Sequence, residues 1–294
     1  MKRILSVLVM SVFSLATLAV SAGAASYSIP PQPDWPKSPW EVGKGLNYHC
    51  LINQGADSTA FDLRVAVLST VKSGNTDLYS IEFDITGITG LPADAQEIFI
   101  QNYGELPSAI RMKMLVPYYD LVRAAVDPTK FYYDITDPAF IRSLVFQYNR
   151  WVPYDVDPAL VGGFILPIFA SYAIGDELPE DFITERNLGV TFVENPVLYT
   201  TENGPSKTAV DAGAFNGWLY TFTSSAEDGK AGSVFYTDKI PILPCILLTG
   251  NWNAHSGPAT VEMELFSVEP SGAATQILGE PMRLDFQSLM YGMQ

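Results

Sequence analysis

The sequence holds few side chains that could act as catalysts. Its two histidines are His49 and His255, and a serine or cysteine nucleophile needs such a base to activate it. His49 lies beside Cys50 in a predicted strand, where neighbouring side chains point to opposite faces, and His255 lies in a predicted turn. The sequence has no G-x-S-x-G, H-E-x-x-H or phosphate-binding motif. We therefore predict no catalytic residues, no metal site and no cofactor.

Carboxylates are plentiful, and the densest group is Asp176, Glu177, Glu180 and Asp181. Their spacing is not that of an EF-hand, so a solvated acidic loop explains them better than a calcium site. A carboxylate pair of the glycosidase kind stays open, because its defining distance does not follow from the sequence.

Three aromatic residues, Trp218, Tyr220 and Phe222, alternate along one predicted strand and therefore share a face. An exposed row of rings would suit a flat apolar ligand or a sugar. Buried strands use the same residue types in their cores. Trp218 and Tyr220 are therefore candidate ligand-binding residues, with an ordinary core as the alternative.

The two cysteines are Cys50 and Cys245. An even number of cysteines in an exported chain is typical of a disulfide, and this pair is our disulfide candidate. Two buried free thiols are the alternative. Because there is no C-x-x-C motif and no Cys/His cluster, the sequence does not favour a thiol redox or zinc site.

These residues must be positioned by strands, because apolar residues recur at every second position through most of the chain from about residue 42. Apolar residues alternate in the runs beginning at Leu46, Phe61 and Tyr79, and a Gly74-Asn75 turn separates the last two. We expect the meander to continue through residues 98–103 and 110–116. A second set of strands is expected at 190–200, 215–223, 233–240, 246–252, 260–268 and 275–286. The pattern predicts a mainly β, antiparallel fold, either a sheet sandwich or an open barrel.

A helical insert near 138–174 is expected to interrupt the strands. Asp137-Pro138 and Asp157-Pro158 are both helix-start signals, an Asp N-cap followed by Pro at the first helical position. Ile141, Leu144, Val145 and Tyr148 then recur at helical spacing.

The segment from Pro158 to Ile174 is apolar nearly all round and must leave water. We expect it to lie against the concave face of the sheet as a removable lid, a fixed plug or an ordinary core helix. If it is a lid, the cavity beneath it binds the ligand. The candidate ligand-binding residues of this segment are Leu160, Phe164, Ile168 and Phe169.

The N-terminus predicts export. Lys2 and Arg3 precede an apolar stretch to Val20, and small residues follow, so residues 1–24 have the pattern of a cleavable signal peptide. No cysteine follows it directly, so we do not expect a lipoprotein. Residues 25–41 form a proline-rich leader, expected to lay Trp35 and Trp40 on the surface. Residues 42–288 are expected to form a single β-rich domain.

The composition narrows the class of partner. The net charge of −15 repels polyanions, so we expect no nucleic acid partner and no preference for acidic lipid headgroups. Hydrophobic residues make up 48% of the chain, enough for a large core. No later apolar run reaches membrane-spanning length without a break, so no transmembrane anchor is expected after cleavage.

Three stretches resemble exported β-rich proteins without assigned activity. Pro39 to Tyr48 (PWEVGKGLNY) resembles their first strand, Asp211 to Phe215 resembles a later "aGxF" strand, and Val234 to Ile242 resembles a "WYS..VPI" strand. The resemblance covers about a fifth of the chain, and it implies a curved antiparallel half-barrel related to periplasmic lipoprotein carriers. The sequence departs from this pattern at Phe235, Pro244 and Leu247. The shared motifs are structural, so no functional residue carries over.

Together these observations predict a periplasmic or otherwise secreted protein that binds an apolar small molecule or envelope component in a sheet concavity, without catalysis. A carbohydrate-active enzyme or sugar-binding module, and a purely structural envelope protein, are the alternatives.

Overall fold

The computed structural model describes residues 39–118, 140–157, 198–224, 231–254 and 257–284. The predicted signal peptide, most of the predicted leader and the segment from Pro158 to Ile174 lie outside them. The described residues form one short helix and one sheet, whose elements are α2 (Ala93–Tyr103), β1 (Gly45–Gln54), β2 (Asp57–Ser73), β3 (Thr76–Thr89), β4 (Ala109–Pro117), β5 (Ser143–Tyr148), β6 (Tyr154–Val156), β7 (Leu198–Val210), β8 (Gly213–Ser224), β9 (Ala231–Tyr236), β10 (Cys245–Ala254), β11 (Gly257–Glu269) and β12 (Met282–Leu284).

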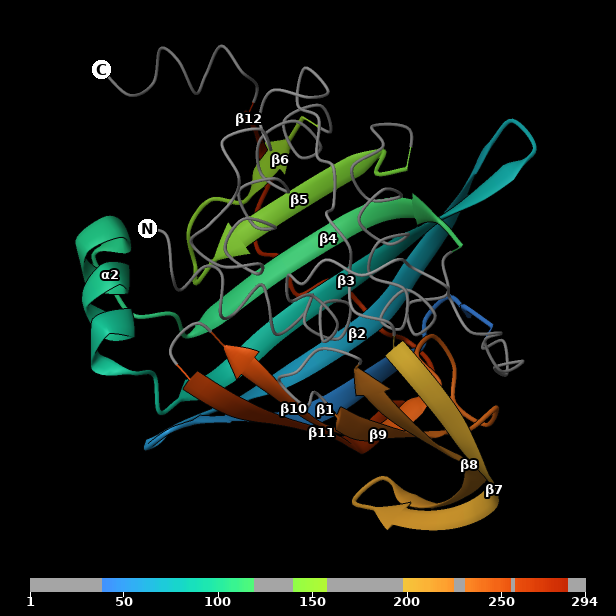
Figure 1. Ribbon diagram of the computed structural model, residues 1–294. Helices are drawn as coiled ribbons and strands as arrows, with labels where there is room; N and C mark the ends of the chain where they lie inside the picture. The colour runs from blue at the N-terminus through green and yellow to red at the C-terminus, as the bar shows by residue number, and fades with distance from the viewer. Residues whose placement is uncertain (1–38, 119–139, 158–197, 225–230, 255–256, 285–294) are drawn as a thin grey trace, which may run out of the picture.

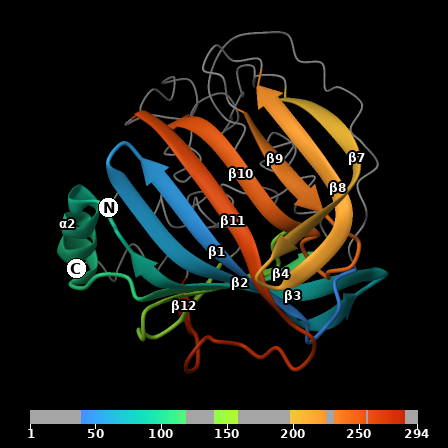
Figure 2. The same cartoon turned by 90° about the horizontal axis from the view of Figure 1, so that it is seen from below.

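Twelve strands make one open, curved sheet in the order β12-β6-β5-β4-β3-β2-β1-β11-β10-β9-β8-β7 (Figures 1 and 2). All neighbours pair antiparallel except β12 and β6, which are parallel. The sheet does not close on itself. The prediction of a mainly β, antiparallel half-barrel is thereby confirmed for the described part of the chain.

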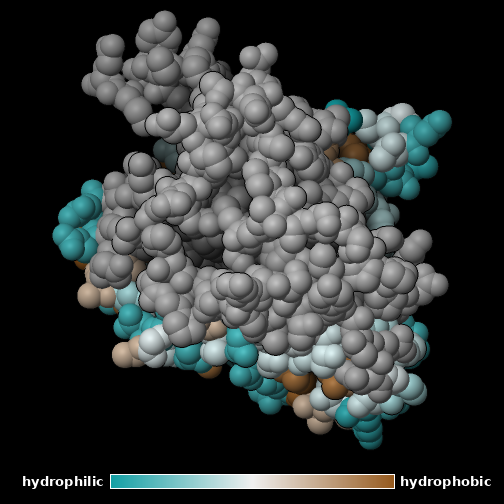
Figure 3. Space-filling model, viewed as in Figure 1, coloured by the Kyte–Doolittle hydropathy of each residue, from teal (hydrophilic) through white to brown (hydrophobic). Residues whose placement is uncertain are grey.

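The first four strands follow the expected alternation. In β1, Leu46, Tyr48 and Cys50 are buried, whereas His49 between them is exposed. The β2–β3 hairpin turns at the predicted Gly74-Asn75, where Gly74 has a φ of 62° that glycine adopts without steric cost. The hydrophilic tip of this hairpin projects from the body of the sheet (Figures 1 and 3).

The prediction of a helix beginning at Asp137-Pro138 is wrong for the part of this segment that the structure describes, because residues 143–148 form the strand β5. Leu144 and Tyr148 face one side of the sheet and Val145 the other, and all three are at most 5% exposed. A strand buried on both faces is apolar throughout, and such a short run cannot be distinguished from a helix by its periodicity. The rest of the expected insert, 158–174, lies outside the described residues.

The strand expected at 98–103 is also wrong, since these residues complete α2. Ala95 and Phe99 lie one helical turn apart and are both buried. Gly104 ends the helix in the left-handed conformation, and its N–H donates to the Ile100 carbonyl. The exposed side of α2 is partly hydrophilic (Figure 3), although Ile100 is 53% exposed.

The strand expected at 275–286 is found only as β12 (Met282–Leu284). Residues 270–281, which we call the strap, leave β11 and cross the convex side of the sheet without forming a strand (Figure 2). The strap then delivers β12 to β6 at one end of the sheet.

Candidate functional site

The two faces of the sheet differ in chemistry. Strand pairing places one apolar set on the concave side, here called the inner face. It consists of Leu46, Tyr48, Cys50, Phe61, Leu63, Val65, Val67, Ile81, Phe83, Ile85, Ile110, Met114, Leu144, Tyr148, Tyr220, Val234, Tyr236, Leu248, Met263 and Leu265. The opposite, outer face carries His49, Asp62, Arg64, Glu82, Asp84 and Arg111. An apolar ligand would therefore be bound on the inner face.

Two polar side chains on the concave side of the sheet, Trp40 and Tyr48, donate hydrogen bonds to backbone carbonyls. The Tyr48 hydroxyl lies 2.8 Å from the Cys245 carbonyl oxygen, and burial raises the pKa of this tyrosine. Trp40 Nε1 donates to the Ile242 carbonyl at 3.2 Å. Trp40 is 6% exposed, so its expected surface position is wrong: the leader enters the core at this residue. These contacts fix the segment that precedes β10.

Both candidate aromatic residues lie on the inner face. Trp218 and Tyr220 of β8 pair with Tyr236 and Val234 of β9. Tyr220 is 2% exposed and meets Tyr236 edge to face with ring centroids 5.5 Å apart, whereas Trp218 is only partly buried. Tyr220 is thus a core residue, and Trp218 is the more accessible of the two. Leu160, Phe164, Ile168 and Phe169 lie outside the described residues.

Cys50 and Cys245 are free, buried thiols in the structure, which corresponds to the second of the two alternatives left open by the sequence. They lie on β1 and β10, with β11 between them. Two strand spacings are about 9.6 Å, more than the roughly 7 Å between Cα atoms that a disulfide can span. Burial raises the pKa of both thiols, so neither is a reactive nucleophile.

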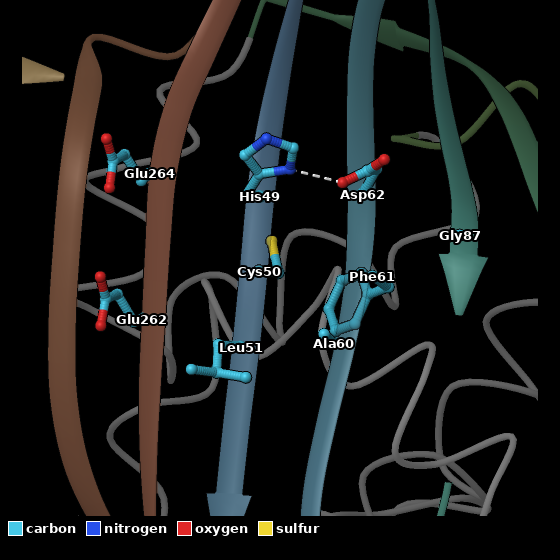
Figure 4. Close-up of a pocket in the computed structure, with 9 residues that line it drawn as sticks. All are labelled: His49, Cys50, Leu51, Ala60, Phe61, Asp62, Gly87, Glu262 and Glu264. Atoms are coloured by element: carbon cyan, nitrogen blue, oxygen red, sulfur yellow. Dashed lines mark hydrogen bonds and ion pairs between the residues drawn. The ribbon is translucent and has the colours of Figure 1, made fainter. Parts of the chain in front are cut away.

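A pocket of about 320 Å³ opens beside His49 on the outer face (Figure 4). His49 Nδ1 lies 2.6 Å from Asp62 Oδ1 across the β1–β2 pair, and Glu264 occupies the position opposite His49 on β11. The His49 ring also stacks on Phe266, with centroids 4.0 Å apart. The residues that line the pocket are His49, Cys50, Leu51, Ala60, Phe61, Asp62, Gly87, Glu262 and Glu264.

Local backbone features make room for the His49–Asp62 pair. Gly87 of β3 has a φ of 63°, and a Cβ there would lie 3.3 Å from Asp62 Oδ2. The β2–β3 register shifts between Ala60 and Asp62, a bulge of the kind that re-aims a side chain. The carboxylate of Asp62 therefore lies between the imidazole and a glycine.

The sequence analysis missed this pair, although a signal for it was present. The Gly55-Ala56 turn pairs Gln54 with Asp57, and counting outward along both strands pairs His49 with Asp62. The arrangement orients an imidazole, but the Cys50 side chain next to it points to the inner face, so this thiol is not paired with the imidazole. Among the described residues, no three His, Cys, Asp or Glu side chains are arranged to hold a metal ion. His255 lies outside them.

The outer face also carries a row of charges under and beside the strap. Arg64 pairs with Glu269 at 2.6 Å and approaches Glu82 at 3.5 Å, while Arg111 Nε lies 3.3 Å from Asp84 Oδ1. Burial raises the pKa of Asp84, and the hydrogen bonds from Arg64 lower the pKa of Glu269. Opposite charges alternate along the row, which is typical of a structural network.

None of the helices in the described ranges is long and apolar enough to cross a membrane.

No known protein family and no curated protein matches the sequence. Two solved structures are similar to the chain in part. One is a Bacteroides fragilis protein described as exported and as having a YmcC-like fold, with 9% identity, 79% of this chain and 97% of that chain covered, and a TM-score of 0.34. The other is a Parabacteroides distasonis protein described as a lipoprotein, with 7% identity, the same coverages and a TM-score of 0.29. Likeness at this level establishes neither a shared fold nor a shared function.

Proposed function

We propose that this chain is an exported envelope protein that holds an apolar small molecule or an apolar envelope component on the inner face of its sheet, without catalysing a reaction. The observation that carries the proposal is the continuous apolar inner face, which extends from β5 to β8. These residues are at most 9% exposed, so they provide the water-free apolar surroundings that an apolar ligand requires.

The outer-face pocket supports an enzymatic function less well than the inner face supports binding of an apolar ligand. His49 and Asp62 form a pair, but the neighbouring thiol lies on the other face and its pKa is raised. The sugar-binding alternative required exposed rings at Trp218 and Tyr220, and Tyr220 is 2% exposed. A purely structural envelope protein is the outcome if no ligand is found.

The test is native mass spectrometry of the protein isolated from its own envelope, followed by organic extraction. We expect a mass above that of the mature chain that disappears on extraction. Trp218→Ala should lower the bound fraction, because Trp218 lies on the inner face and is only partly buried. Leu219→Ala is the matched control, since Leu219 is the next residue of β8 and points to the outer face. No added mass in the wild type, or equal loss in both variants, would contradict the proposal.

Export has its own test. If residues 1–24 are a cleaved signal peptide, the intact mass of the secreted protein should correspond to a chain that begins within two residues of Ala25. A secreted chain that retains Met1 would show that the segment is not removed.

A further inference from the structure

The strap (270–281) is stretched across the convex side of the sheet. It begins after Glu269 at the end of β11 and ends at Met282 of β12, and the six strands from β1 to β6 lie between these two ends of its path. Seven strand spacings amount to about 34 Å, and its residues would reach about 40 Å if fully extended. The strap therefore has little slack and must follow a direct path over the outer face.

Side chains of the sheet hold the strap by its backbone. The N–H of Gln276 donates to Glu82 Oε1 at 2.7 Å, and the N–H of Leu278 donates to Gln147 Oε1 at 2.9 Å. Gln147 Nε2 donates back to the Leu278 carbonyl at 2.9 Å, and Arg64 Nη2 donates to the Ala274 carbonyl at 3.2 Å. These contacts come from three strands, β2, β3 and β5.

Thr275 adds a side-chain contact of its own. Its hydroxyl donates to Glu82 Oε2 at 2.5 Å, so both carboxylate oxygens of Glu82 accept hydrogen bonds from the strap. Glu82 is completely buried beneath it. We call Glu82 a latch, meaning a side chain of the sheet whose hydrogen bonds hold the strap in place.

Apolar burial contributes little to this attachment. Of the strap residues only Ile277 is buried, at 8% exposure, and most of the others are exposed. A segment held by a few hydrogen bonds and one apolar side chain can open without global unfolding. Opening would also return the buried charges of Glu82 and Arg64 to water, which offsets part of the lost hydrogen bonding.

We propose that the strap is a clasp that opens and closes on the folded sheet, with Glu82 and Gln147 as its latches. Opening would detach β12, whose pairing with β6 covers only three residues. The edge of the sheet would then pass from β12 to β6, and an uncovered edge can pair with another strand. Opening and closing of the strap would thus control whether this edge of the sheet is covered. This proposal does not depend on ligand binding to the inner face.

Hydrogen exchange of the folded, mature protein, followed by NMR, tests this proposal. In the wild type the amides of Gln276, Leu278 and Asp157 should exchange together, at least about 100-fold faster than ladder amides of β2 and β3 but far slower than in an unfolded peptide. Asp157 is included because its N–H donates to Leu284 of β12.

Thr275→Val removes the hydrogen bond to Glu82 and also the acceptor of the Ile277 N–H within the strap, at a position where the side chain is exposed and no core packing changes. It should speed exchange of the strap amides at least about tenfold, because a charged hydrogen bond and a second, neutral one are lost, and leave β2 and β3 within twofold. Gln147→Leu should have a similar or larger effect, and Glu262→Gln, an outer-face change in the middle of β11, should have none. Equal exchange rates for strap and ladder amides in the wild type, equal acceleration of both in Thr275→Val, or unprotected strap amides would each overturn the proposal.

Discussion

Arg64 and Glu269 form a bidentate pair across 205 residues of sequence. Arg64 Nε donates to Glu269 Oε1 at 2.6 Å, and Nη2 donates to Oε2 at 3.0 Å. Arg64 is in the middle of β2 and Glu269 is the last residue of β11, immediately before the strap. The pair therefore fixes the point at which the chain leaves the sheet and begins to cross its outer face.

Replacing Arg64 by lysine should destabilise the fold. Lysine keeps the positive charge but cannot donate to both carboxylate oxygens in the planar geometry of a guanidinium. We expect Arg64→Lys to lower the free energy of unfolding by about 1–2 kcal/mol, measured by urea denaturation. Asp77→Asn is the control, because Asp77 is 54% exposed and faces a largely exposed Lys72 at 4.0 Å; it should cost under about 0.5 kcal/mol. Equal losses in both variants would mean that the bidentate geometry is unimportant.

Glu269 should also make stability depend on pH. The hydrogen bonds from Arg64 lower its pKa in the folded state, whereas in the unfolded chain a glutamate titrates near about 4.3. Its contribution is therefore fully present above that unfolded value and is lost as the pH falls through the folded pKa.

Glu269→Gln is the matching test. The stability advantage of the wild type over this variant should be constant between about pH 6 and pH 7 and shrink below about pH 4.5. Asp84, whose pKa burial raises, acts in the opposite direction, but it is present in both proteins and cancels in the difference. An advantage that stays unchanged down to pH 3 would show that Glu269 is not stabilised as the charged form.

The two thiols should be unreactive in the native protein. Cys50 and Cys245 are 7% and 1% exposed, and burial raises the pKa of both, so very little thiolate is present at neutral pH. We expect no labelling by a thiol reagent under native conditions and two labelled thiols per chain after denaturation without reductant. If the denatured, unreduced chain shows no free thiol, the cysteines are bonded after all.

The apolar segment at 158–174 gives a prediction that rests on the sequence alone. If it is a core helix, replacing Phe164 and Phe169 by Ala should cost several kcal/mol, since each such truncation costs about 3–5. If it is a removable lid, the melting temperature should change little while binding of the dye ANS changes. Phe164→Leu, which keeps an apolar side chain, should cost under about 1.5 kcal/mol in either case. A large loss of stability with unchanged dye binding would exclude the lid.

Much of the strand content could be predicted from the sequence, because the period of two is a local property. Leu46, Tyr48 and Cys50 predicted which side of β1 is buried, and Gly74-Asn75 predicted a hairpin. The same local reasoning failed at Leu144 and Tyr148, where burial of both faces removes the alternation. It also failed at Phe99, whose helical spacing from Ala95 was overlooked in an apparent strand pattern.

The sequence by itself determined the β class, the apolar face of each central strand and the absence of familiar catalytic motifs. Only the tertiary structure decided which strands are neighbours: it puts β11 between Cys50 and Cys245, buries Tyr220 against Tyr236, and brings Thr275 to Glu82 and Glu269 to Arg64. Periodicity reports which way a side chain points from its own strand, since that depends only on local backbone geometry. It carries no information about the order of strands in the sheet or the path of the strap, because these depend on contacts between residues about 200 positions apart.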